Sequence, residues 1–368
     1  MGIACRWRGA GQALIMPRWI PDYLSGHHID RGWRALGALL AVASLLELAA
    51  GLGLASIAGF SQVAMVLASF NWHWLLVLPG AWTISYLGYY HAYRGVFRVR
   101  AGPAMRRRDV AAVALAGFGG FLAYRGGSLD GHALRTAGAS EQDARIRVAA
   151  LAGLEQGALA LAGCGVSVAV LLAGIPGIPA SATLTWAAAP IPGLLIAFWL
   201  ADRFRDRLAG DKGWRAMVRT FLGSILVIKE LFSNPLRFGP AILGMTVFWL
   251  ADAVAAWAGL AAFGFGMNAA ALFIGFASGM VFSRRVGPLA GAGILALVLP
   301  LTISYCGAPL ATAVAGIFAY RILSLWLPAP SWIAALPALR KISGHRIEKT
   351  RAEPAPIIGQ PARPALRG

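Results

Sequence analysis

The chain has 368 residues, of which 58% are hydrophobic and only 13% are charged, and its mean hydropathy is +0.66. Its apolar runs reach about 20 residues, the length that an α-helix needs to cross the hydrocarbon core of a bilayer. They lack the polar alternation of barrel strands, so the composition excludes a soluble domain and predicts an all-α integral membrane protein. The net charge of +18 lies in short loops beside apolar runs rather than in a basic folded domain, which argues against nucleic-acid binding.

Three parts follow one another along the chain. Residues 1–33 are expected to form a cytoplasmic N-terminal segment, because their arginines flank too short an apolar stretch for a cleavable secretion signal. Residues 34–338 are expected to form a polytopic bundle, and 339–368 a basic, disordered cytoplasmic tail. The bundle has about eight predicted transmembrane helices, at about 34–57, 73–93, 149–174, 184–201, 238–263, 267–283, 288–306 and 308–327.

The run from Ala111 to Tyr124, between the second and third spans, is too short to cross a bilayer. We expect a re-entrant helical hairpin at about 109–125, which keeps the later basic segment 202–237 on the cytoplasmic side. Its turn is expected at the glycines in the middle of the run, namely Gly117, Gly119 and Gly120.

The distribution of positive charge predicts an orientation. Of the 33 Lys and Arg, only Arg321 lies well inside a predicted span, and the outer loops 58–72, 175–183 and 264–266 contain none. Because cytoplasmic loops carry the excess of Lys and Arg, both termini are expected in the cytoplasm. Within the amphipathic segment 202–237, the apolar face of 215–233 is typical either of an interfacial helix or of a surface helix packed on the bundle.

Four ionisable residues fall inside predicted spans: Glu47, Glu155, Asp252 and Arg321. Each costs several kcal/mol there unless it is paired or faces water, so we interpret them as the lining of a polar substrate pathway. Structural ion pairs or interfacial anchors are the alternatives. We expect Arg321, the basic member of the set, to pair with Asp252 or Glu155.

A second candidate site lies where the seventh span begins. A helix N-terminus with free amides beside guanidinium groups suits a phosphate, although close packing by small residues gives the same glycine pattern. The residues expected to contact a lipid headgroup or its phosphate are Arg125, Arg284, Arg285, Gly287, Gly291 and Gly293.

The sequence contains no catalytic motif, no nucleotide-binding loop and no Cys or His spacing typical of a metal site. We therefore expect no enzyme activity, no cofactor and no metal. A membrane-embedded transferase is a weaker alternative.

The C-terminal motifs resemble a known family, the flippase-like membrane proteins, which include the transmembrane region of lysylphosphatidylglycerol synthases. The similarity covers about residues 34–338. It is carried by Gly287 to Gly293, by Gly307-Ala308-Pro309, by Tyr320-Arg321-Ile322-Leu323-Ser324-Leu325-Trp326-Leu327-Pro328, by Leu134 to Ser140 after Gly126-Gly127, and by Trp249 with Asp252.

This resemblance implies a lipid flippase or translocator that moves a phospholipid, an aminoacyl-phospholipid or a hopanoid-like lipid between the leaflets of the bacterial inner membrane. The chain departs from the family pattern where Ala296 replaces a frequent Glu, and where Gly127 or Ser128 replaces an acidic residue, which implies a different lipid. Aminoacylation is not expected, since the soluble synthase domain is not part of the similarity. The alternative from another class is a non-transporting membrane partner or scaffold of a lipid-modifying enzyme.

Overall fold

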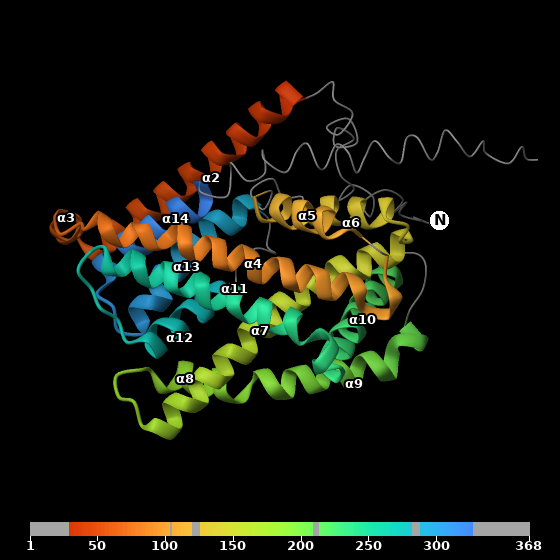
Figure 1. Cartoon of the computed structure of the whole chain (residues 1–368). Coiled ribbons are helices and arrows are strands. Elements are labelled where there is room, and N and C mark those ends of the chain that lie inside the picture. The colour runs from red at the N-terminus through yellow and green to blue at the C-terminus, as the bar shows by residue number, and fades with distance from the viewer. Residues whose placement is uncertain (1–28, 104, 120–125, 209–212, 282–287, 327–368) are drawn as a thin grey trace, which may run out of the picture.

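The computed structural model describes residues 29–103, 105–119, 126–208, 213–281 and 288–326, and every regular element in these ranges is a helix (Figure 1). This confirms the all-α class. The helices in chain order are α2 (Ile29–Ala58), α3 (Phe60–Ala68), η1 (Trp72–Leu76), α4 (Val77–Arg98), η2 (Val99–Ala101), α5 (Arg107–Gly119), α6 (Gly126–Thr136), α7 (Glu141–Ala173), α8 (Ala180–Ala188), α9 (Pro190–Leu208), α10 (Gly213–Ser233), α11 (Pro235–Ala261), α12 (Ala269–Met280), α13 (Pro288–Tyr305) and α14 (Leu310–Trp326).

Several helices have the length and composition of membrane spans. In the part of the chain that the structure describes, four segments meet both criteria: Ala41–Ala58 in α2, α7, Ala180–Phe204 across α8 and α9, and α11. A fifth arises if α3 and the segment Trp72–Arg98, which are bent by 78° relative to each other, count as one span.

The three remaining apolar helices, α12, α13 and α14, are shorter than these spans. The 12 residues of α12 rise only about 18 Å, well short of a hydrocarbon core of about 30 Å. The structure is that of a helical membrane-spanning protein, whereas the number of eight spans stays a prediction.

The bundle is organised around α4 and α11, which lie side by side through its middle (Figure 1). A Cβ on Gly88 would lie 2.3 Å from the carbonyl oxygen of Gly244, and a Cβ on Gly95 would lie 2.2 Å from the Cβ of Ala241. Contacts that advance along α4 recede along α11, so the two helices are antiparallel. Small residues let them approach closely, which is a common way for helices to associate in membranes.

A series of buried aromatic rings extends from this crossing through the core. Successive ring centroids lie 4.9–6.4 Å apart, in edge-on or tilted contacts that each contribute roughly 0.5–1.5 kcal/mol beyond burial. The series passes from α4 through α11 and α12 to α14 along Phe97, Tyr93, Tyr89, Phe248, Trp249, Phe276 and Tyr320.

Of the predicted re-entrant hairpin at about 109–125, the structure describes α5, and α6 follows directly after its predicted end. The two helices pack on each other, α5 also packs on α4, and α6 also packs on α7. The hydroxyl of Tyr86 on α4 donates to the carbonyl oxygen of Ala111 at 3.0 Å, which fixes α5 to the bundle. Gly117 and Gly119 belong to the last turn of α5, and Gly120 lies outside the described residues. Because α6 begins at residue 126, it lies wholly after the predicted hairpin, and a re-entrant hairpin at 109–125 stays a prediction.

The predicted amphipathic segment contains α10, which packs on α7, α9 and α11. The bundle covers the C-terminal half of its apolar face, including Leu222, Ile225 and Leu226, whereas Trp214 and Met217 near its start are exposed. The C-terminal half of α10 is thus packed on the bundle, while an interfacial position of its first half stays a prediction.

Candidate functional site

Two of the four predicted ionisable residues, Glu47 and Arg321, form an ion pair between α2 and α14. Arg321 donates from Nε to Oε1 of Glu47 at 3.0 Å and from Nη2 to the same oxygen. Glu47 is 1% exposed and Arg321 is 6% exposed, so the pair is sealed from solvent. The expected pairing of Arg321 with Asp252 or Glu155 is wrong, because α14 packs along α2 and directs this side chain to Glu47.

A small cavity adjoins this ion pair at the junction of α2, α13 and α14. Arg321 lines it together with Gly51, Ala296, Pro300 and other apolar residues, and the space open to the centre of a water molecule is about 10 Å³. That is room for about one water. Pro300 has no N–H, so it cannot donate the helical hydrogen bond to the carbonyl of Ala296. The other oxygen of Glu47, Oε2, has no hydrogen-bond partner within the described ranges.

The other two acidic residues lie where α7 meets α11. The indole Nε1 of Trp249 donates to the backbone carbonyl oxygen of Glu155 at 2.7 Å, and this fixes α11 against α7. Glu155 is 1% exposed, and Asp252 lies half-buried about one helical turn after Trp249. Acidic side chains therefore come from both helices of this crossing.

The two buried polar places are connected by packed rings. Trp249, beside Glu155, contacts Phe276, which in turn contacts Tyr320, the residue before Arg321. Of the four predicted pathway residues, Glu47 contacts Arg321, whereas Glu155 contacts α11, the helix that contains Asp252. In the described arrangement Glu47 and Arg321 form one buried pair, Glu155 is buried at the crossing of α7 and α11, and aromatic side chains lie on the path between these two places.

The predicted headgroup site lies mostly outside the described residues, which include none of Arg125, Arg284, Arg285 and Gly287. Gly291 and Gly293 both lie in α13. A Cβ on Gly293 would lie 3.8 Å from the Cβ of Leu46, an ordinary contact, so close packing does not require glycine there. The phosphate site stays a prediction.

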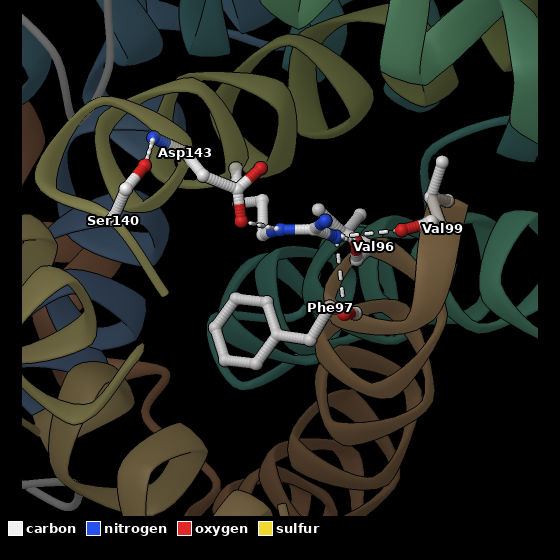
Figure 2. Close-up of polar contacts among 6 residues, drawn as sticks. Val96, Phe97, Val99, Ser140 and Asp143 are labelled. Carbon is white, nitrogen blue, oxygen red and sulfur yellow. Dashed lines mark hydrogen bonds and ion pairs between the residues drawn. The ribbon is translucent and has the colours of Figure 1, made fainter. Parts of the chain in front are cut away.

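A buried arginine that the sequence analysis did not single out, Arg147, fixes the C-terminal end of α4. Arg147 on α7 is buried and donates from Nη1 to the carbonyl oxygens of Val96, Phe97 and Val99 at 2.9–3.0 Å (Figure 2). A guanidinium group in this position satisfies the last carbonyls of α4 and complements the negative end of its dipole. A Cβ on Gly102 would lie 2.5 Å from Nη1 of Arg147, so only glycine leaves room for this contact.

The start of α7 holds the arginine in place. Ser140 caps the helix by accepting the N–H of Asp143 at 3.1 Å, and Asp143 Oδ2 accepts from Nε of Arg147 at 2.7 Å (Figure 2). The sequence carries a signal for this arrangement, since a serine cap, an acid three residues later and an arginine four residues beyond the acid all lie at helical spacing. The sequence analysis overlooked this signal because it assigned the positive charges to short loops beside the apolar runs.

Asp130 on α6 is a further buried acid, 4% exposed, and it lies in a segment that the sequence did not predict to be buried. Within the described ranges, no three His, Cys, Asp or Glu residues are grouped so that they could hold a metal ion.

Comparison with known protein families and with curated proteins finds no match for this chain. The resemblance to flippase-like membrane proteins therefore stays an expectation that rests on the motifs themselves.

Proposed function

We propose that this protein moves a phospholipid or another lipid-linked molecule between the leaflets of a bacterial inner membrane. The observation that supports this proposal most directly is the Glu47–Arg321 ion pair, sealed inside an apolar helical bundle. Ionisable groups at membrane depth are costly, and a substrate or ion pathway is their usual role. The similarity of the C-terminal motifs to flippase-like proteins agrees with this interpretation.

The chemistry of the buried residues fits a polar lipid headgroup. The planar guanidinium group of Arg321 can donate hydrogen bonds to a phosphate, while the carboxylates of Glu47 and Glu155 can pair with a cationic group of a lipid headgroup. In the described arrangement Glu47 and Arg321 neutralise each other, so a headgroup that enters has to exchange with this pair. The junction of α2, α13 and α14, where the cavity lies, is the place for that exchange.

Leaflet exchange of fluorescent phospholipids in vesicles tests the proposal. The informative variant is the double substitution Glu47→Gln with Arg321→Gln, because it removes both charges without leaving one of them unpaired. Exchange should be well above that of protein-free vesicles for the wild type and at least about tenfold slower for the double variant, a barrier increase of about 1.4 kcal/mol. Leu45→Ala is the matched control, since Leu45 is exposed on the same helix and should leave exchange unchanged. Wild-type exchange no faster than in empty vesicles would refute transport of the lipids tested.

One observation supports the alternative of a membrane partner or scaffold. In the candidate span Ala180–Phe204 only 6% of the residues of the apolar window are fully buried, and large apolar side chains such as Leu195 and Trp199 are exposed, so the span presents an apolar face to lipid or to another membrane protein. A scaffold needs this surface and does not need the buried charges. Substitution of exposed residues such as Trp199 and Leu195 would then impair the function in cells, while the neutral double variant would retain it.

A further inference from the structure

The apolar face of α10 is only half covered by the bundle. Its stripe starts with Trp214, Met217 and Phe221, which share one face because they are three and four residues apart. These side chains are 59%, 71% and 63% exposed, whereas Ile225 and Ile228, which continue the same stripe, are buried. The described bundle therefore leaves the first half of the stripe uncovered.

The position of α10 indicates that the exposed half of its stripe faces a membrane surface. It follows the candidate span Ala180–Phe204 and precedes the candidate span of α11, which begins at Pro235. An amphipathic helix between the adjacent ends of two spans lies at the boundary between lipid and water. Apolar packing of Leu222 and Leu226 on Ala201 fixes the orientation of α10 against α9, and an exposed ion pair between Lys229 and Asp202 lies beside this contact.

The positive charge around the exposed stripe favours anionic lipids. Residues 202–219 contain six Lys and Arg against three Asp. The arginines Arg203, Arg207, Arg215 and Arg219 are exposed on α9 and α10. The guanidinium carbon of Arg215 lies 5.7 Å from the ring centroid of Trp214, so the indole and a positive charge are presented together. Tryptophan favours the headgroup layer, and basic residues beside it attract anionic lipid.

From this geometry we propose that the first half of α10, residues 213–221, together with the exposed end of α9, binds the headgroups of anionic phospholipids at the membrane surface. The apolar stripe enters the layer below the headgroups, while the arginines contact the phosphates. The proposal is independent of lipid transport, because it places a lasting contact at the surface rather than a passing headgroup in the bundle.

A fluorescent reporter on the stripe tests the proposal. Met217→Cys, in a Cys5→Ala background, is labelled with an environment-sensitive dye and placed in vesicles of phosphatidylcholine, with or without phosphatidylglycerol. Cys164 and Cys306 are buried, and the background protein without the new cysteine measures any labelling of them. We expect a blue shift with phosphatidylglycerol, and loss of that shift in Arg215→Gln with Arg219→Gln and at high salt, where exposed charges are screened.

The matched control is Arg145→Gln, which removes an exposed arginine on α7 and should leave the shift intact. An identical, water-like emission in both kinds of vesicle would overturn the proposal and favour a protein partner for this face. An equal blue shift in both kinds of vesicle would also overturn it, since the stripe would then insert without regard to lipid charge. Either result would leave the leaflet-exchange assay unaffected, so the two proposals fail separately.

Discussion

Arg321 on α14 and Glu47 on α2, 274 residues apart in the sequence, form an ion pair in which both residues are buried. One carboxylate oxygen accepts from two nitrogens of the guanidinium group. The pair joins α2, the first described helix, to α14, the last, so its stability and its rearrangement bear on the whole molecule.

Removing one charge of this pair should be worse than removing both. Glu47→Gln leaves a buried guanidinium without a counter-charge, and we expect it to lower the free energy of unfolding by about 3–5 kcal/mol. Glu47→Gln combined with Arg321→Gln should recover most of that loss. Thermal or denaturant unfolding in detergent, followed by circular dichroism, measures the cycle, and additive losses would contradict a direct coupling of the two side chains.

A carboxylate supplied from α13 should partly replace Glu47. Ala296 lines the same cavity as Arg321, so Ala296→Asp in the Glu47→Gln protein places a new acid near the unpaired guanidinium. We expect a gain of about 1–2 kcal/mol in that background and a loss in the wild type, where Glu47 already occupies Arg321. Ala296→Asn is the control for size, and an equal gain with Asn would show that charge is not the cause.

The crossing of α4 with α11 should not tolerate even one added methyl group. Gly88→Ala would place a Cβ 2.3 Å from the carbonyl oxygen of Gly244, which forces the helices apart at a cost of about 1–3 kcal/mol. Gly80→Ala on the same helix meets no atom within 4 Å and should be neutral or slightly stabilising. Comparing the melting temperatures of the two variants separates close packing from helix propensity, and similar effects would refute the tight crossing.

Arg147 should be far more sensitive than its exposed neighbour Arg145. Arg147→Gln removes charge-assisted hydrogen bonds to three carbonyls at the end of α4, and we expect a loss of about 2–4 kcal/mol. Arg145 pairs with Glu141 at the surface, so Arg145→Gln should cost less than about 1 kcal/mol. Limited proteolysis of the segment after α4 reports the local effect, and equal protection in both variants would contradict the role assigned to Arg147.

The helical class, the apolar segments and the four ionisable residues within them were all predictable from the sequence, because hydropathy and helical periodicity are local properties of a chain. That Glu47, Glu155, Asp252 and Arg321 lie within apolar helices follows from hydropathy along the chain. Likewise, the amphipathic pattern of α10 can be recognised from the sequence of that helix alone.

The partners of these residues depended on tertiary structure. Arg321 meets Glu47 rather than Asp252 because α14 packs along α2, and neither the rotation of a helix nor its neighbours can be derived from its own hydropathy. The same reason hid Arg147, which any count of basic residues assigns to a solvated loop until the end of α4 is placed beside it. It also decided which half of the apolar face of α10 is buried, since only the packing of α7, α9 and α11 determines where the bundle ends and the lipid begins.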